Sequence, residues 1–131
     1  MKTRIVAAIA LSTCMLVGQA AAQDEVSLAG TWTGQRERIA KVEGKRDGSA
    51  TLVITEQNGR TFKGYLNRSN ADGGVKEDLW GAFTPGGRLM VGSDEEGFYS
   101  FALVDANTLD YCYSESGSSA RSVCARLSRK R

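Results

Sequence analysis

The segment that decides the fold lies near the end of the chain, at residues 108–128, and reads TLDYCYSESGSSARSVCARLS. A turn centred on residues 117–119 places Cys112 directly opposite Cys124. Two facing cysteines in an exported protein form a disulfide. Because the spacing is not Cys-x-x-Cys and both residues fall in mid-strand, we expect a structural, outward-facing disulfide across a β-hairpin.

The same alignment sorts the neighbouring residues by their chemistry. Asp110 falls opposite Arg126, which gives an opposite-charge cross-strand pair on the face of the cysteines. A slip of one residue would move every side chain to the other face, so these features fix the pairing together. The other, apolar face of the predicted hairpin carries Leu109, Tyr111, Tyr113, Val123, Ala125 and Leu127.

Short β-rich runs alternate with Gly, Asn, Asp and Ser along the rest of the chain, a pattern typical of a sandwich or barrel. No segment keeps a helical period for three turns, so the predicted class is all-β. The connections are short, which favours pairing of neighbours, and a meander of eight strands closes most economically into an up-and-down antiparallel barrel. The predicted strands are residues 28–39, 49–56, 60–68, 76–84, 88–93, 97–105, 108–114 and 120–128.

Two further turns set the predicted faces. A three-residue loop at residues 57–59 pairs Glu56 with Arg60 and sorts apolar from polar side chains better than a two-residue Asn-Gly turn would. A turn at residues 85–87 is followed by Leu89 and Val91, which we expect to face the interior.

The first 22 residues have the pattern of a secretory signal peptide. Lys2 and Arg4 precede a short apolar run, and cleavage is expected after Ala22. Cys14 gives an alternative, a lipoprotein processing site, although it lies inside the apolar run. The predicted mature domain, residues 23–131, has no transmembrane segment and is expected in the periplasm or secreted.

The charge balance argues against a nucleic-acid partner. Lys2 and Arg4 account for the whole net charge of +2, so the predicted mature chain carries equal numbers of basic and acidic residues. A dedicated nucleic-acid binder shows a basic face instead. Only residues 126–131 are locally basic. They are either a solvated terminus or, in an envelope-associated structural protein, a contact with anionic envelope polymers.

Residue types that usually carry catalysis are missing from the sequence. It contains no histidine, the two cysteines of the domain are expected to be oxidised, and no Gly-x-Ser-x-Gly elbow occurs. The adjacent acids at residues 94–96 lack the spacing of a calcium loop and are interpreted as a solvated turn. We therefore expect no enzyme activity, no catalytic residue, no metal site and no cofactor.

Binding surfaces are the more promising features. Arg36, Glu56 and Arg60 fall near predicted strand ends, where a barrel mouth would lie, and form the candidate ligand site. Eight-stranded barrels are either filled by side chains or hold one small ligand, and the sequence leaves both open.

A second candidate surface lies on the outside. Trp80, Met90, Phe98 and Tyr65 share the outward parity and predict a contact surface for another protein or a second copy. The alternative is a register shifted by one residue, which would place Trp80 in the core.

The opening segment, residues 28–34 (LAGTWTG), resembles the Gly-x-Trp start of the calycin superfamily, which includes avidins and lipocalins. The resemblance implies that Gly30 and Trp32 help to close one end of the barrel and that a small ligand enters the other. Biotin binding is not implied, because avidin-like sites need several tryptophans and only Trp80 remains besides Trp32.

The same segment is similar to the start of small secreted bacterial metalloprotease inhibitors, which also form a barrel with one disulfide. Their cysteine follows the first strand, whereas here both lie in the last hairpin. The sequence thus predicts an exported, non-catalytic binding module with a small-molecule or protein partner. The alternative is an inhibitor of an extracellular or periplasmic hydrolase, a protease or a lysozyme, acting through loops or residues 23–27.

Overall fold

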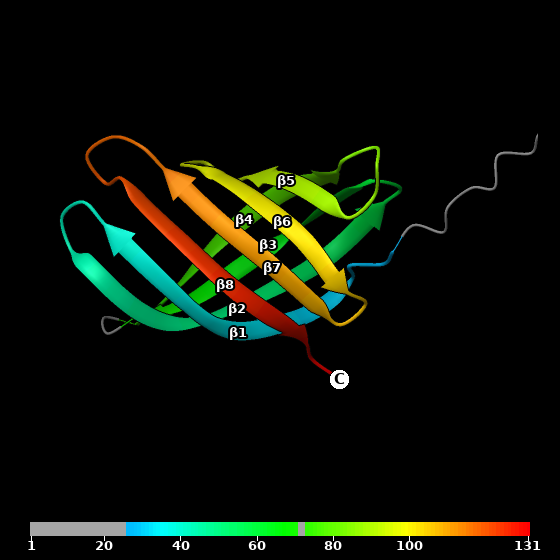
Figure 1. The fold of residues 1–131 in the computed structure, drawn as a ribbon, viewed down its shortest axis with the longest axis horizontal. Coiled ribbons are helices and arrows are strands. Elements are labelled where there is room, and N and C mark those ends of the chain that lie inside the picture. The colour runs from blue at the N-terminus through cyan, green and yellow to red at the C-terminus, as the bar shows by residue number, and fades with distance from the viewer. Residues whose placement is uncertain (1–25, 71–72) are drawn as a thin grey trace, which may run out of the picture.

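Eight antiparallel strands follow one another around a closed barrel in chain order, and the last pairs with the first (Figure 1). The computed structural model describes residues 26–70 and 73–131. The predicted all-β meander barrel is confirmed. The strands are β1 (Gly30–Ala40), β2 (Gly44–Asn58), β3 (Thr61–Asn70), β4 (Gly73–Phe83), β5 (Leu89–Ser93), β6 (Phe98–Asp105), β7 (Thr108–Glu115) and β8 (Arg121–Arg129).

Two strands begin earlier than predicted. β2 begins at Gly44 rather than at residue 49, because residues 44–48 continue the ladder with the end of β1. β4 begins at Gly73 rather than at residue 76. The charged residues 45–47 have the composition of a loop, but they pair through their backbones while their side chains stay exposed. The predicted signal peptide, including Cys14, lies outside the described residues.

The last hairpin has the predicted register. Cys112 pairs with Cys124 and the two form a disulfide on the outer face, with a Cα–Cα distance of 4.1 Å. Next to them, Arg126 Nε and Nη2 donate to Asp110 Oδ1 and Oδ2 at 2.7 and 2.8 Å. The apolar face of the hairpin points into the barrel, so the pattern of cysteines, charges and apolar residues was sufficient to align these strands.

The hairpin between β2 and β3 has the predicted faces but a different register. Glu56 pairs with Lys63 and Asn58 with Thr61, not Glu56 with Arg60. The turn is the two-residue Gly59-Arg60, in which Gly59 has a φ of 58°, and Gly at the first turn position is typical of a type II′ turn. The ladder shifts between Ile54 and Glu56, and this bulge restores the inward parity that the predicted loop would have supplied.

The prediction for β5 was wrong by one residue. Thr84 N donates to Leu89 O at 2.7 Å, so the turn contains residues 85–88 and Phe83 pairs with Met90. The extra turn residue exchanges the faces of the whole strand. Met90 is buried in the core at 1% exposure, while Leu89 and Val91 point outward.

Closure of the barrel depends on a close approach between β1 and β8. A Cβ atom on Gly34 would lie 2.0 Å from the carbonyl oxygen of Arg126. Any larger residue at position 34 would therefore force the two backbones apart at the seam. On either side of this point the ladder pairs Thr33 with Ser128 and Arg36 with Ala125.

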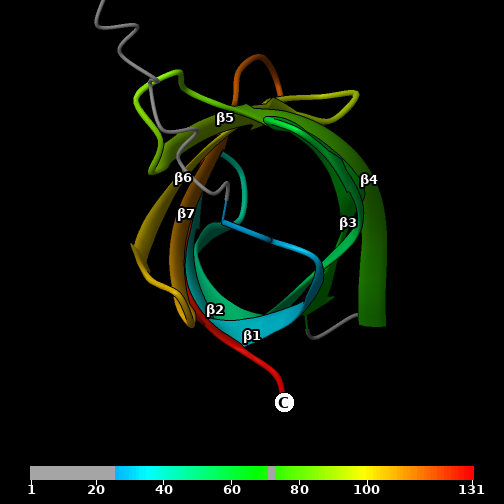
Figure 2. The same cartoon turned by 90° about the vertical axis from the view of Figure 1, so that its right-hand side faces the viewer.

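The apolar core fills the half of the barrel that contains the start of β1 and extends past the middle to Tyr113 and Val123, beside Arg38. The Phe62 ring packs edge-on against Phe83 and Phe101, with ring centroids 6.0 and 5.9 Å apart. Gly81 makes room for it, because a Cβ there would lie 2.2 Å from Phe62 Cζ. The segment before β1, drawn in blue, crosses this end of the barrel (Figure 2). This half of the interior is therefore packed, not hollow.

We predict that reducing the disulfide weakens the barrel without unfolding it. The bond joins residues 12 apart, and closing a loop of this length stabilises by about 3 kcal/mol in the chain-entropy model. Urea unfolding of the reduced protein should show that loss, and the Cys112→Ser/Cys124→Ser variant should coincide with the reduced wild type. Equal stability of the oxidised and reduced proteins would contradict the prediction.

The corrected register of β5 is tested by two neighbouring substitutions. Met90→Ala should cost about 2–5 kcal/mol, because it opens a cavity in the core. Val91→Ala should change the free energy of unfolding by less than about 0.5 kcal/mol, because Val91 is exposed. Chemical denaturation of both variants measures the difference. A larger loss of unfolding free energy in Val91→Ala than in Met90→Ala would support the register predicted from the sequence instead.

Candidate functional site

One end of the barrel is closed by a tryptophan under an arginine. Trp32 is fully buried, and its Nε1 donates to Leu28 O at 2.9 Å. The guanidinium of Arg129 lies 4.1 Å from the centre of the Trp32 ring, a cation–π contact. Arg129 also donates to the carbonyl oxygens of Ser27, Ala29 and Ala106. The structure thus places Trp32 at a sealed end, which we call the closed end, with Gly30 at the strand start.

The opposite half of the interior is polar, and we call it the polar end. The inward positions of β1 continue from Trp32 to Arg36 and Arg38, which are 2% and 4% exposed. Alternation along a strand forces these residues inside, because successive side chains point to opposite faces. Other buried or largely buried charged side chains at this end are Arg68, Glu77, Glu115 and Arg121.

Three of the four arginines at the polar end have a carboxylate partner. Arg38 Nη2 lies 2.6 Å from Glu43 Oε2, and Arg121 Nε lies 3.0 Å from Glu115 Oε1. The third pair is Arg68 with Glu77. Burial raises the pKa of the Glu77 carboxyl, although Arg68 opposes the shift. These pairs hold the side chains of β3, β4, β7 and β8 in place around the interior.

Arg36 has no carboxylate partner among the residues that the structure describes. Its Nε and Nη2 donate to the carbonyl oxygens of Ser49 and Ser69, at 3.3 and 2.7 Å. Its Nη1 is buried without a hydrogen-bond partner. Burial lowers the pKa of the guanidinium, but an arginine stays charged in a protein, so the site holds an uncompensated positive charge.

Four buried polar atoms in the described residues lack a partner, and all four can donate a hydrogen bond. They are Arg36 Nη1, Arg38 Nε, Arg68 Nε and the Tyr111 hydroxyl. Burial raises the pKa of Tyr111 to about 12, while the charges of Arg36 and Arg68 act in the opposite direction. Tyr111 and Arg36 flank the same residue of β8, because each pairs with Ala125 from its own strand. Buried polar groups are nearly always satisfied, so a cluster of four unpartnered donors needs a physical reason.

The connection between β5 and β6 is held by Asp94. Its Oδ1 accepts from the backbone N–H groups of Glu96 and Gly97, at 2.9 and 2.7 Å. Its Oδ2 accepts from the Tyr99 hydroxyl at 3.1 Å, and burial raises the pKa of Tyr99. Asp94 is therefore a structural acceptor that shapes the turn.

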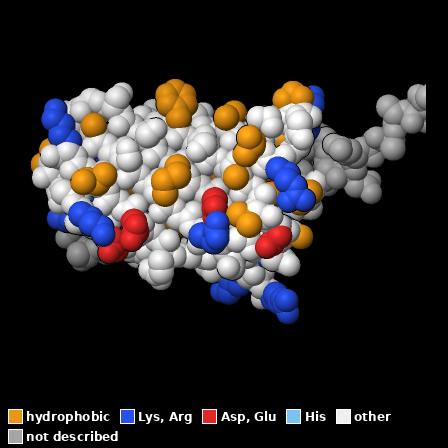
Figure 3. All heavy atoms as spheres, viewed as in Figure 1, with side chains coloured by type: hydrophobic (Ala, Val, Ile, Leu, Met, Phe, Trp, Pro, Cys, Tyr) orange, Lys and Arg blue, Asp and Glu red, His pale blue; other side chains and the backbone are white. Residues whose placement is uncertain are grey.

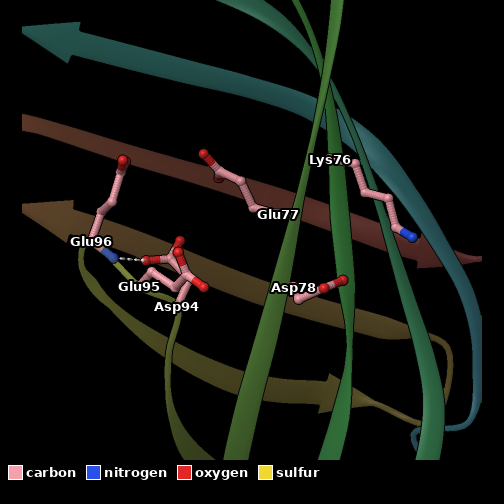
Figure 4. A pocket seen from close by; sticks show the side chains of 6 residues that line it. All are labelled: Lys76, Glu77, Asp78, Asp94, Glu95 and Glu96. Carbon is pink, nitrogen blue, oxygen red and sulfur yellow. Dashed lines mark hydrogen bonds between the residues drawn. The ribbon is translucent and has the colours of Figure 1, made fainter.

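A pocket of about 230 Å³ opens beside this turn. It forms because β5 pairs only with residues 80–83 of β4, so the first half of β4 has no ladder to β5. Glu77 links the pocket to the interior, because it lines the pocket and pairs with Arg68. The volume lies slightly below the roughly 300 Å³ of a small drug-sized site. The lining residues in Figure 4 are Lys76, Glu77, Asp78, Asp94, Glu95 and Glu96.

The three predicted ligand residues are not brought together, which corrects that prediction. Arg36 belongs to the polar end, whereas Arg60 lies exposed in the β2–β3 turn at the closed end. Glu56 is exposed there as well and pairs with Lys63 at 2.9 Å. The meander places alternate hairpins at opposite ends, so Arg36, in the half of β1 that leads to the β1–β2 turn, cannot share a mouth with the β2–β3 turn. Tyr111 was predicted on the inward face, and parity within β1 could have identified Arg38 as an inward polar group as well.

One of the four residues predicted to form the outer surface, Met90, does not lie on it. Trp80 and Phe98 are 51% and 74% exposed, while Tyr65 is half-buried under Lys76, whose Nζ lies 4.3 Å from its ring centre. Met90 is in the core and does not belong to the surface. On the side seen in Figure 3, hydrophobic side chains are separated from one another by other side chains, and most of the charged ones lie in the lower half or at the two ends. The apolar strip on β4, β5 and β6 consists of Trp80, Leu89, Val91 and Phe98.

Residues 26–70 and 73–131 contain no group of three or more His, Cys, Asp or Glu side chains that could hold a metal ion. In the same part of the chain, no helix is long and apolar enough to cross a membrane.

Comparisons with known proteins show the fold and no family. No family model and no curated protein matches the chain. A redesigned β-barrel matches with a TM-score of 0.60 and 12% identity, over 79% of this chain and 92% of its own. The S-type phycobiliprotein lyase CPES from Guillardia theta matches at 0.56 and 7%, over 79% and 89%. The protein mFAP2b bound to DFHBI matches at 0.52 and 14%, over 79% and 94%.

The buried tyrosine at the polar end predicts a loss of stability in alkali. Tyr111 has a pKa of about 12 in the folded protein and about 10 when unfolded. Its contribution is fully present below about pH 10 and is lost as the pH rises through 12, because the unfolded chain releases its proton first. The free energy of unfolding should therefore fall between these values, and less steeply in Tyr111→Phe. Denaturant unfolding across this range tests it, and equal slopes would contradict it.

Proposed function

We propose that this protein is an exported, non-catalytic binding protein that holds a small molecule at the polar end of its barrel. The observation that carries the proposal is the cluster of unpartnered buried donors beside a polar pocket. In calycin-like barrels, which the Gly-x-Trp start resembles, one end is closed and the other end holds the ligand. This barrel likewise has a packed closed end and a polar end beside a pocket. One structural neighbour is a small barrel bound to DFHBI, so this architecture can hold a small ligand.

The residue chemistry supports a binding role rather than a catalytic one. The sequence has no histidine, and Cys112 and Cys124 are joined as a disulfide. Two of the five carboxylates that line the pocket have structural partners: Asp94 accepts from the backbone of its own turn, and Glu77 pairs with Arg68. The other three, Asp78, Glu95 and Glu96, are exposed to solvent.

Export is supported by the disulfide together with the leader pattern. Disulfides persist in oxidising compartments such as the bacterial periplasm or the extracellular space. The positive start, apolar run and Ala22 site of the sequence point to the same compartments.

A protein partner is the second candidate. It is favoured by the apolar strip, since Phe98 and Val91 are 74% and 60% exposed on neighbouring strands. Such a strip suits a hydrolase held by an inhibitor, or a second copy of the chain. It lies outside the barrel, so it is compatible with a ligand inside.

The small-molecule proposal is tested by blocking the pocket. Glu96→Trp places a bulky ring on the pocket wall, while Ser100→Trp adds the same ring to the exposed outer face of β6. In a thermal-shift screen of acids, amines, sugars and apolar compounds, a ligand should raise the Tm of the wild type. Saturation at 100 times the Kd adds about 2.7 kcal/mol, or a Tm rise of ~10 °C in a domain of this size.

The increase should disappear in Glu96→Trp and persist in Ser100→Trp. Equal shifts in both variants would place the ligand elsewhere. A screen in which no compound stabilises the wild type would contradict the proposed function itself.

A further inference from the structure

The polar end has an excess of buried positive charge. Among the residues that the structure describes, four arginines surround it, and the buried carboxylates paired with them are Glu77 and Glu115, whose side chains are 18% and 5% exposed. Glu43 approaches Arg38 from the solvent side, with 41% of its side chain exposed. Within the described part of the chain, the positive charge that remains uncompensated is centred on Arg36, which donates to two carbonyl oxygens.

An unpaired guanidinium in the interior is strongly unfavourable. It cannot lose its proton, and removing a charge from water without a counter-charge costs free energy that two carbonyl acceptors offset only in part. A protein tolerates such a group where a ligand supplies the missing charge. A bound anion would neutralise the charge of Arg36 and accept a charge-assisted hydrogen bond from its guanidinium.

The unpartnered hydrogen-bond donors favour an anionic ligand, as the excess positive charge does. Arg36 Nη1, Arg38 Nε and Arg68 Nε are N–H donors that cannot accept, and the Tyr111 hydroxyl is the fourth. Arg36 and Tyr111 are both buried and lie on either side of β8 at the same level, since each pairs with Ala125. A group with several acceptor oxygens would satisfy them together, whereas a cation would satisfy none of the three arginines.

The acidic rim does not make the pocket a cation site. Both oxygens of Asp94 already accept hydrogen bonds from the protein, and Glu77 is neutralised by Arg68. Glu95 and Glu96 are exposed, so their charges are screened over about 8 Å at physiological salt. The buried arginines are screened much less, and their charge dominates inside the barrel.

We infer that the ligand of the proposed site carries an anionic oxygen group, a carboxylate or a phosphate, that binds between Arg36 and Tyr111. This inference rests on the proposed function and names its ligand class. One ion pair joins the pocket to the donor cluster, because Glu77 lines the pocket and its partner Arg68 carries one of the unpartnered donors. The anionic group occupies the inner position, and the remainder of the molecule lies in the pocket.

Titration with simple anions tests the inference and separates the two sources. The probes are sodium phosphate, sodium acetate and sodium succinate, with choline chloride as the cationic control at matched ionic strength. Calorimetry and thermal unfolding should show saturable binding of phosphate, of the carboxylates or of both, and no saturable effect of choline chloride. A response to phosphate alone assigns a phosphorylated ligand, and a response to carboxylates alone assigns an organic acid.

Three variants locate the site. Arg36→Met replaces the unpaired charge by an apolar side chain of similar length; it should fold at least as stably as the wild type and lose anion binding. Tyr111→Phe removes only an unpartnered hydroxyl and should weaken binding about tenfold or more, as expected for a hydrogen bond to a charged group. Arg126→Met, on the outer face beside Asp110, should bind anions like the wild type.

Anion binding that persists in Arg36→Met and Tyr111→Phe would overturn the inference, and so would the absence of a response to every anion at millimolar concentration. If a neutral or cationic compound nevertheless binds and is blocked by Glu96→Trp, the proposed function stands and only the ligand class is wrong. If no compound of any charge binds, both fail.

Discussion

The ladder between β1 and β8 joins the first strand to the last, from Trp32 opposite Arg129 to Ala40 opposite Arg121. Once this seam closes, the sheet has no free edge over most of its length, and every second residue of each strand must point into a confined interior. Gly34 permits the seam because the carbonyl of Arg126 occupies the space of its missing side chain. The contents of the interior are therefore set by strand parity, and the proposed binding site is built from inward residues.

The interior divides along the barrel axis because the inward residues change in character along the strands. At one end Trp32, Leu52 and Phe62 are buried apolar residues, and the packing is dense enough to require Gly81 beside the Phe62 ring. At the other end Arg36 and Tyr111 occupy inward positions. Because the hydrophobic effect stabilises one half, the other half can carry buried charge without loss of the fold.

The sequence predicted most where several independent features had to agree. In the β7–β8 hairpin, the cysteines, the Asp110–Arg126 pair and the apolar residues all demanded the same alignment. At β5 only a turn of uncertain length separated Phe83 from Met90, and one additional turn residue exchanged the faces of the strand. At the β2–β3 turn the faces were right, but a bulge after Ile54 changed the pairing. Turn length and bulges depend on backbone geometry that composition describes poorly.

The candidate site was largely hidden from the sequence. Arg36 was identified, but its proposed companions Glu56 and Arg60 belong to the opposite end of the barrel. Arg68 and Glu77 meet locally, across the β3–β4 hairpin, but Tyr111 lies on β7 and comes near Arg36 only through closure of β8 on β1, since both residues pair with Ala125.

The sequence by itself determined the class of fold, the number of strands and the final hairpin, because these follow from local alternation and from one pair of cysteines. Only the tertiary structure decided which ends of the strands share a mouth, which arginine lacks a counter-charge and where the pocket opens. Those properties depend on distances between residues on different strands. Such distances exist only after β8 has returned to β1 and enclosed the charged side chains in the interior of the barrel.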